Sequence, residues 1–413
     1  MNKDIDKIET QYNEYPYPLP IQDIQEKIVN GYSQGSCPER LWQRIFPEKK
    51  YKDDLNVLIA GCGTNQAIYH ALKFPNSRHY AIDLSENSLR HVNNMIKKYD
   101  IKNLIIEKKS ISELKNNNEF DYVVSTGVIH HTKNPQESLN TLVNATKSDG
   151  ALFIMVYATY LRVGIYYLQD AFRYLGLKNN SEGINIGKRL IQLSPKNHYA
   201  NNYLEIINNS KTGTKDLSFD AGFIDTFFNE RDISYDSFQL KNLITKSGAY
   251  FQNWYDNAHH YRDLFNFGDL SKLDIKLQKL DPWELTDFTQ KMCPTSGKFS
   301  FTLRKKMKYE NRFFKIEDLI STTYVRKLLK THPSSNEKDY KSEGVISDGY
   351  RKIKINVLEK IIWGLIDNKM DVILVKANKI ISSLDTNKEL SFLELQKIIH
   401  SFWKNGYVSL ADL

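Results

Sequence analysis

Two glycines, followed twenty residues later by an aspartate, are the residues whose spacing most clearly indicates chemistry. The hydrophobic run 57–60 leads directly into Gly61-Cys62-Gly63. A strand that runs into Gly-x-Gly is typical of a sharp turn at which a ligand approaches the backbone closely. Asp83 ends the next apolar run, where its carboxylate can accept hydrogen bonds from both ribose hydroxyls of an adenosine cofactor. Together these positions indicate a nucleoside ligand.

The residue that follows this turn helps to decide which nucleoside fits. A dinucleotide-binding turn has a third glycine, which lets the N-terminus of a helix approach a pyrophosphate. Gln66 occupies that position here. The turn therefore favours an adenosine cofactor without a pyrophosphate, and S-adenosylmethionine fits best.

An alternation of short apolar runs with longer amphipathic stretches would position these residues. From about residue 55 the apolar runs have the length of strands, and stretches such as 87–99 repeat apolar residues at helical spacing. This alternation predicts a parallel sheet with crossover helices, an α/β doubly wound fold whose ligand crevice lies at the carboxyl ends of the strands. The predicted strands are 55–60, 79–82, 103–107, 120–125, 151–157, 250–255 and 298–304.

The order of the motifs resembles that of class I S-adenosylmethionine-dependent methyltransferases over about residues 50–305. The turn at 61–63 resembles the first motif of that family, and Asp83 resembles its ribose-binding acid. Residues 120–131 (FDYVVSTGVIHH) resemble its fourth motif, and residues 147–155 (KSDGALFIM) resemble the loop and strand that follow. The resemblance implies a Rossmann-like, seven-stranded sheet with S-adenosyl-L-methionine as its cofactor.

The resemblance also implies a set of cofactor-binding residues at the ends of the first four strands. Ser110 and Ile111 stand where the family places residues beside the adenine. The predicted cofactor-binding residues are Ala60, Gly61, Cys62, Gly63, Asn65, Asp83, Leu84, Ser110, Ile111, Thr126 and Gly127. The sequence departs from the family at Ile59, which replaces an acid two places before the first glycine, and at Ser110, which replaces an acid often found near the adenine amine. These departures leave a non-catalytic cofactor-binding or regulatory protein as one alternative.

The catalytic candidates follow from the chemistry of methyl transfer. Displacement at a sulfonium methyl is in-line and gains much of its rate from positioning, whereas a general base is needed only if the acceptor must lose a proton. His130 and His131 end the fourth motif, beside the expected methyl group. We therefore take them as the candidate catalytic residues. No histidine or cysteine spacing predicts a metal site.

Segments before and after the first five strands are expected to cover the crevice. Residues 1–49 are predicted to be an N-terminal arm with helices, and some members of the family fold such an arm over the cofactor. Residues 158–245 are predicted to be a helical lid inserted into the methyltransferase domain, which spans 50–305. The candidate substrate-contacting residues of the arm and lid are Tyr15, Tyr17, Asp225 and Tyr235.

Residues 312–413 are predicted to form a small, mostly helical C-terminal domain. Ser391 and Glu394 have the spacing of a capping box at the start of the last helix, which Gly406 ends. An alternating strand pattern follows the glycine and resembles the helix-to-wing step of winged-helix modules. Such a domain would be compatible with a homodimer or with recruitment of a macromolecule.

The composition limits the class of protein and its partners. The chain has 413 residues, of which 41% are hydrophobic, so a wholly disordered chain is excluded. The formal net charge is +8, but arginine, the residue favoured for phosphate and base recognition, is the minority among the basic residues. Three scattered cysteines, no signal-peptide pattern and no apolar run of membrane-spanning length favour a cytoplasmic protein without membrane association.

The leading hypothesis is therefore a methyltransferase that acts on a small molecule. The motif Ser125-Thr126-Gly127-Val128 after the fourth strand is what small-molecule methyltransferases tend to show. A protein or RNA methyltransferase recruited through the C-terminal domain is the second hypothesis, and the non-catalytic protein is the third.

Overall fold

The structure is a computed structural model that describes residues 7–209, 216–261, 276–277, 279–336, 339–347, 352–384 and 389–412. The chain packs into two compact units. Unit 1 comprises residues 1–39, 52–251 and 290–307, and unit 2 comprises residues 40–51, 252–289 and 308–413. No described helix is both long and apolar enough to cross a membrane.

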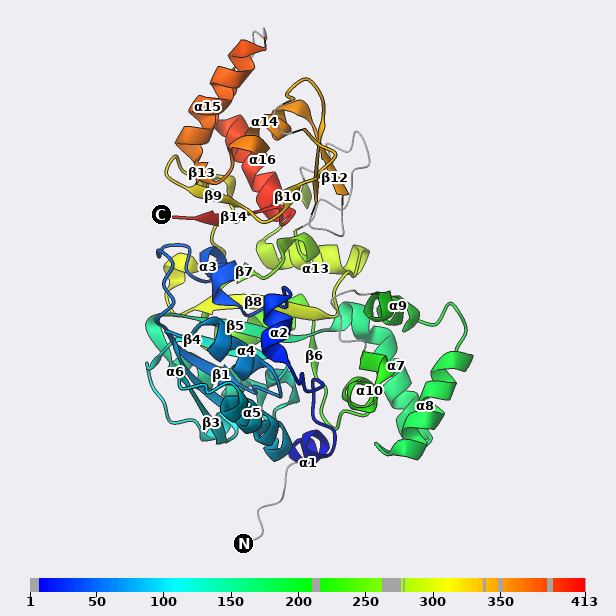
Figure 1. Cartoon of the computed structure of the whole chain (residues 1–413). Helices are drawn as coiled ribbons and strands as arrows, with labels where there is room; N and C mark the ends of the chain where they lie inside the picture. The colour runs from blue at the N-terminus through cyan, green and yellow to red at the C-terminus, as the bar shows by residue number, and fades with distance from the viewer. Residues whose placement is uncertain are drawn as a thin grey trace. The chain divides into compact units, whose positions relative to one another are not determined.

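A largely parallel sheet forms the centre of unit 1 (Figure 1). Its strands are β1 (Asn56–Ala60), β2 (Arg78–Asp83), β3 (Leu104–Lys108), β4 (Phe120–Thr126), β5 (Thr146–Ala158), β6 (Ser234–Tyr235), β7 (Tyr250–Trp254) and β8 (Lys298–Arg304). The main path has the order β3-β2-β1-β4-β5-β8-β7, and the short β6 pairs with β5. The first five strands run parallel to one another, and β8 runs antiparallel to β5. The predicted doubly wound α/β fold with a Rossmann-like sheet is confirmed.

The order in which strands are added to the sheet reverses at β1. The carboxyl ends of β1 and β4 are therefore the expected ligand site. From β1 the chain moves outward to β2 and β3, then returns to place β4 on the other side of β1. Ligands of open α/β sheets bind at such a switch point, beside the carboxyl ends of the strands. The predicted cofactor residues of β1 and β4 therefore lie at the switch point, where a ligand crevice is expected.

The connecting helices follow the apolar spacing read from the sequence. They are α4 (Gln66–Lys73), α5 (Glu86–Lys98), α6 (Pro135–Ala145) and α11 (Ser237–Lys246). In α5 the side chain of Ser85 caps the first turn, and Leu89, Val92 and Met95 are buried on one face. An α-helix has about 3.6 residues per turn, so residues three positions apart lie on nearly the same face. In α5 this face packs on the sheet.

Two short helices and a helical insertion complete unit 1. In the N-terminal segment, α1 (Lys7–Glu14) packs on α5 and α2 (Ile24–Val29) packs on α4. The insertion contains α7 (Thr159–Tyr174), α8 (Ser181–Leu193), α9 (Asn201–Asn209) and α10 (Asp220–Phe227), drawn in green in Figure 1. These helices have a core of their own, built around Ile165, Phe172, Phe223 and Phe227. We refer to residues 7–21 as the arm and to residues 159–235 as the lid.

Unit 2 combines helices with two small sheets. Its helices include α14 (Val357–Leu365), α15 (Met370–Ser383) and α16 (Phe392–Lys404), while α3 (Pro38–Ile45) and α13 (Pro282–Met292) each have residues in both units. One sheet has the order β10-β11-β12 (Lys330–Thr331, Gly344–Ser347, Lys352–Ile355). The other has the order β13-β9-β14 (Asn368–Lys369, Tyr324–Lys327, Val408–Ala411). The strands of 324–355 were not predicted, because they are short and several of them are strongly polar.

The end of the chain has the expected helix-glycine-strand order, and it also holds distant segments within unit 2. Ser391 caps α16 in a capping box with Glu394, Gly406 has a φ of +73°, and β14 follows. The amide of Asp412 donates to the carbonyl of Pro47 at 2.8 Å. Ser409 Oγ donates to Gln43 Oε1 at 2.5 Å. Unit 2 therefore includes an early segment that the predicted boundary at residue 312 left outside it.

We expect Ser391→Ala to make the amides of α16 exchange faster with solvent. An N-cap serine stabilises a helix by about 1 kcal/mol, so its loss should speed exchange by about fivefold in hydrogen-exchange mass spectrometry. Ser382→Ala is the matched control, because its hydroxyl bonds to the carbonyl of Asn378 within α15 and to no other described residue. Equal effects of the two substitutions would contradict the assigned cap.

Candidate functional site

The turn after β1 requires glycine for two separate reasons. Gly61 and Gly63 have φ angles of +76° and +53°, a region that side chains with a Cβ rarely adopt. A Cβ on Gly61 would also lie 2.2 Å from Cγ2 of Val128. The amides of Gly61 and Cys62 both donate to the carbonyl of Ile82, at 2.9 and 3.0 Å. The turn is thus fixed to the end of β2.

The carboxylate of Asp83 connects this turn to the start of α5. Its Oδ2 accepts from the amide of Gly63 and its Oδ1 accepts from the amide of Ser85, both at 2.8 Å. Burial raises the pKa of Asp83 above the usual range of an aspartate, although hydrogen bonds from backbone amides act in the opposite direction. Each carboxylate oxygen retains capacity for a further hydrogen bond, so the group remains able to accept from hydroxyl groups of a ligand.

The remaining predicted cofactor residues lie along the same edge of the sheet. Ala60 ends β1, Leu84 follows β2, Ser110 and Ile111 follow β3, and Thr126 and Gly127 stand at the end of β4. These four strands are neighbours in the sheet, so the structure brings the predicted set to one edge of the sheet. Ser110 Oγ donates to Glu113 Oε2 at 2.9 Å in the cap of a short helix. The role of each residue in binding a cofactor stays a prediction.

The arm lies directly on the glycine turn. Thr64 Oγ1 donates to the carbonyl of Pro18 at 2.7 Å, and Asn65 Nδ2 donates to the carbonyl of Leu19 at 2.8 Å. Asn65 Oδ1 accepts from the amide of Ile21 at 2.9 Å. Both polar atoms of the Asn65 side chain therefore bond to the arm, whereas the motif predicted a contact with the cofactor. That contact stays a prediction.

The two tyrosines predicted in the arm both contact the lid. The ring of Tyr17 stacks on Phe219, with the ring centroids 6.4 Å apart. The ring of Tyr15 packs against the core of the lid. The arm and the lid thus form one cover, which spacing along the sequence could not reveal.

Asp225 is buried at the centre of a hydrogen-bonded cluster that joins arm, sheet and lid. Tyr12 OH donates to Asp225 Oδ1 at 2.7 Å, and Tyr157 OH donates to Asp225 Oδ2 at 3.1 Å. Asn229 Nδ2 donates to Tyr12 OH at 3.2 Å. Among the described residues, no lysine or arginine forms an ion pair with Asp225. We call Tyr12, Tyr157, Asp225 and Asn229 the carboxylate cluster.

The environment of the cluster keeps both tyrosines protonated at neutral pH. Burial is the larger cause, and the Asp225 carboxylate the second, of pKa values well above the usual tyrosine range at Tyr12 and Tyr157. Tyr12 is also anchored near the cofactor edge, because its carbonyl accepts from Ser85 Oγ at 2.9 Å. The cluster therefore lies between the end of β2 and the end of β5, and its carboxylate faces neutral donors.

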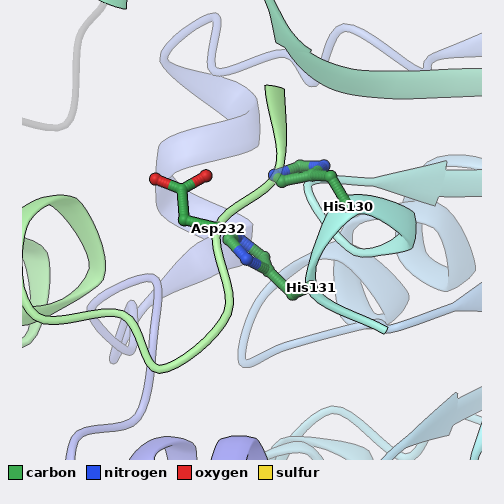
Figure 2. A group of neighbouring side chains, drawn as sticks. All are labelled: His130, His131 and Asp232. Carbon is green, nitrogen blue, oxygen red and sulfur yellow. The ribbon is translucent and has the colours of Figure 1, made fainter. Parts of the chain in front are cut away.

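The predicted catalytic histidines lie beside this cluster, with their rings 4.1 Å apart (Figure 2). They belong to a short helix, Ile129–His131, that follows β4. The ring of His130 lies 4.1 Å from that of Tyr157, and the ring of His131 lies 6.5 Å from that of Tyr12. Burial holds the pKa of His130 well below the usual histidine range, so this imidazole is neutral at physiological pH. Catalysis by either histidine stays a prediction.

Tyr235 does not join the carboxylate cluster through any hydrogen bond among the described residues. It lies in β6 opposite Ala158 and lines a cavity of about 250 Å³ together with residues of α6 and α11. The other lining residues are Gln136, Ile233, Ser234, Gln239, Asn242 and Leu243. Its contact with the acceptor stays a prediction. The residues that line the cavity do not include any member of the carboxylate cluster.

Several residues of the site were not predicted from the sequence. Tyr157 and Arg162 flank the end of β5, and Asp232 lies in the lid segment before β6. The guanidinium of Arg162 lies 3.7 Å from the centroid of the Tyr157 ring and is paired with Asp232 at 2.8 Å. Of these three residues, only Tyr157 had a feature in the sequence that could have indicated it, because it ends a predicted strand.

Comparison with known proteins identifies the sheet and its glycine turn. Residues 51–162 match the family model described as a methyltransferase domain. Residues 51–162 therefore form a methyltransferase domain, which supports the resemblance to class I S-adenosylmethionine-dependent methyltransferases. A methyltransferase domain supports S-adenosylmethionine as the cofactor, in agreement with the inference drawn from the missing third glycine.

Similar proteins extend the likeness beyond this domain. PKMT2 from Rickettsia typhi has a TM-score of 0.65 and 15% identity, with 92% of this chain and 77% of that chain covered. PKMT2 in complex with AdoHcy has a TM-score of 0.64 and 14% identity, with 92% and 76% covered. An uncharacterised protein of Synechococcus sp., syc1184_c, is 25% identical over 303 residues, which are 70% of this chain and 69% of that protein. The structural likeness to PKMT2 includes residues of both units.

We expect Asp83→Asn to weaken binding of S-adenosylmethionine by about tenfold to a hundredfold at neutral pH. The substitution removes a charged acceptor, and hydrogen bonds to charged groups contribute about 1.5–3 kcal/mol. Isothermal titration calorimetry measures the change. Asp100→Asn is a matched control, because Asp100 is exposed and an asparagine tolerates its φ of +52°. A wild-type affinity in Asp83→Asn would show that the carboxylate does not hold the ribose.

We also expect the affinity of the methyltransferase for its cofactor to fall at mildly acidic pH. Only the ionised carboxylate can accept from two ribose hydroxyls without itself donating, and the pKa of Asp83 is raised by burial. The affinity should therefore be lost as the pH falls through this raised pKa, above the range in which an exposed aspartate is protonated. Asp83→Asn has no such group, so its weaker affinity should stay constant over the same range. Parallel pH profiles would contradict the assignment.

Proposed function

We propose that this methyltransferase transfers the methyl group of S-adenosylmethionine to an amine nitrogen of a small molecule that binds beside Asp225. The observation that carries the proposal is the buried carboxylate, whose described partners are neutral hydroxyl and amide groups. Burying a carboxylate without an opposite charge is unfavourable. A cationic ammonium group of the acceptor would supply that charge.

The rings around the carboxylate suit the same class of acceptor. His131 and Tyr157 have their centroids 5.5 Å apart, and Tyr12 lies against His131. Aromatic faces next to a carboxylate attract ammonium and methylated ammonium groups through cation–π interactions. RNA bases offer amines that are neutral, so this cluster favours them less than an alkyl amine.

The transfer itself requires an unprotonated nitrogen. The bound ammonium first releases a proton to solvent, and the nitrogen lone pair then attacks the methyl carbon as the carbon–sulfur bond breaks. The electron pair of that bond remains on sulfur, which gives AdoHcy and the methylated ammonium. Asp225 would orient the nitrogen through both states by charge attraction and hydrogen bonding, and positioning of this kind supplies much of the rate.

A small acceptor is supported by the way the cluster is covered. Tyr12 comes from the arm and Asp225 from the lid, and the side chain of Asp225 is buried, so both segments help to cover the carboxylate. A methyltransferase of this kind would act on metabolites, and the cytoplasm, predicted from the sequence, is where such acceptors occur. A protein side chain could also carry the amine, and for that reason the acceptor classes must be compared directly.

The acceptor class is tested by following transfer of a labelled methyl group from S-adenosylmethionine. Three sets of acceptors are offered to the full chain: small amines and amino acids, lysine-containing peptides, and RNA. We expect label to enter the small amines. Label found only in the peptides or only in RNA would overturn the small-molecule proposal, and no transfer to any acceptor would favour the non-catalytic alternative.

We expect Asp225→Asn to lower kcat/KM for the amine by about a hundredfold. Removing one partner of a buried charge pair costs about 2–5 kcal/mol, and about 3 kcal/mol corresponds to that factor. The affinity for S-adenosylmethionine, measured by calorimetry, should change by less than about threefold. Asp220→Asn is the matched control, since Asp220 lies on the same helix and pairs with the side chain of Lys188 near the surface. A loss of cofactor affinity equal to the loss of kcat/KM would instead assign Asp225 to the cofactor.

A further inference from the structure

Three side chains with metal-ligating atoms converge at the end of β4. One ligand atom each from His130, His131 and Asp232 lie within 4.8 Å of one another (Figure 2). His130 and His131 follow β4, whereas Asp232 comes from the lid segment that leads into β6. We call these three residues the histidine–aspartate cluster.

Three buried atoms of this cluster have no hydrogen-bond partner in the described part of the chain. They are both ring nitrogens of His130 and the Oδ1 atom of Asp232. The side chains of His130 and Asp232 are both fully buried. Buried polar atoms are almost always hydrogen-bonded. Unpaired atoms on two residues that lie close together in space therefore indicate that a common partner binds between them.

The backbone selects which nitrogen of His131 can bind a metal. Nδ1 of His131 lies 2.5 Å from the carbonyl oxygen of Arg231, an acceptor, so Nδ1 carries the proton and donates it. The lone pair is therefore on Nε2. Arg231 Nη1 donates back to the carbonyl of His131 at 2.9 Å, which fixes both residues. Metal-bound histidines are oriented in this way by a hydrogen bond from the second nitrogen.

The carboxylate of Asp232 is also oriented, with one oxygen left over. Its Oδ2 accepts from Arg162 Nη2 at 2.8 Å and from Gln169 Nε2 at 3.1 Å. The other guanidinium nitrogens of Arg162 donate to Tyr166 and Tyr203, so this cation does not turn toward Oδ1. The positive charge of Arg162 repels a metal ion. We therefore expect the site to bind a metal more weakly than it would if Asp232 had no cationic partner.

We propose that His130, His131 and Asp232 bind a divalent transition-metal ion such as Zn²⁺. Two imidazole nitrogens and one carboxylate oxygen form a ligand set that suits zinc and other first-row ions and leaves an open coordination position. Zinc bonds of about 2.0–2.1 Å place tetrahedral ligands about 3.3 Å apart, so the three atoms must move together by at most about 1.5 Å. The sequence predicted no metal, because Asp232 is far from the histidines along the chain.

The metal site would fasten the lid to the end of β4. Its ligands are separate from Asp83 and from Asp225, so the proposal does not depend on the class of acceptor. Because His130 contacts the ring of Tyr157, a bound ion would lie next to the carboxylate cluster. Binding of S-adenosylmethionine to the metal-free protein would remain measurable in either case.

Co²⁺, the spectroscopic probe for zinc, tests the site in the full chain. We expect Co²⁺ to bind with one ion per chain and to give visible absorption bands of a histidine-ligated ion, which Zn²⁺ then abolishes by displacement. His130→Ala and His131→Ala should each weaken Co²⁺ binding by at least about tenfold. Circular dichroism and calorimetry with S-adenosylmethionine establish that each variant is folded.

His332→Ala is the matched control, because it removes a histidine whose ring bonds to Ser334 in unit 2. It should bind Co²⁺ as the wild type does. The proposal is overturned if the wild type gives no saturable bands, or if His130→Ala and His131→Ala retain them unchanged. Asp232→Asn is a second variant, and unchanged affinity in it would limit the site to the two histidines and contradict the proposed ligand set.

Discussion

The hydrogen bonds to the buried carboxylate of Asp225 hold the candidate active site together. One oxygen accepts from Tyr12 in the arm and the other from Tyr157 at the end of β5, while Asp225 itself lies in the lid. One group thus joins the arm, the lid and the sheet, and it also supplies a negative charge to the site. Among the described residues this carboxylate accepts only from neutral donors, so its charge is poorly compensated, and the proposed cationic acceptor rests on this observation.

The sheet and the glycine turn could be predicted because their information is local. Largely apolar strands of four to seven residues, Gly61-Cys62-Gly63 and the aspartate after the second predicted strand are all read within short windows. The carboxylate cluster could not be predicted, since its hydrogen bonds join residues 213 and 68 positions apart. Asp225 was singled out as a lid residue, but nothing in its spacing named Tyr12 or Tyr157 as its partners.

At some motif positions, other groups of the protein compete with the cofactor for the hydrogen-bonding atoms of the side chain. Asn65 follows the glycine turn, yet the backbone of the arm takes both polar atoms of its amide. Ser110 follows β3, yet its hydroxyl and amide bond to Glu113 three residues later. Ile59, where the family usually has an acid, is buried within β1. A residue type at a motif position thus predicts a place in the crevice better than it predicts a hydrogen bond.

The absence of an acid at Ile59 leaves two cations that Asp225 could attract, the ammonium of the acceptor and the ammonium of the cofactor's own methionyl group. A crystal structure of the full chain with AdoHcy separates them most directly. We expect the sulfur atom to face the carboxylate cluster and the amine of AdoHcy to be bound elsewhere, which leaves Asp225 beside a cavity for the acceptor. An ion pair between that amine and Asp225 would contradict the proposed role of Asp225, because the carboxylate would then belong to the cofactor site.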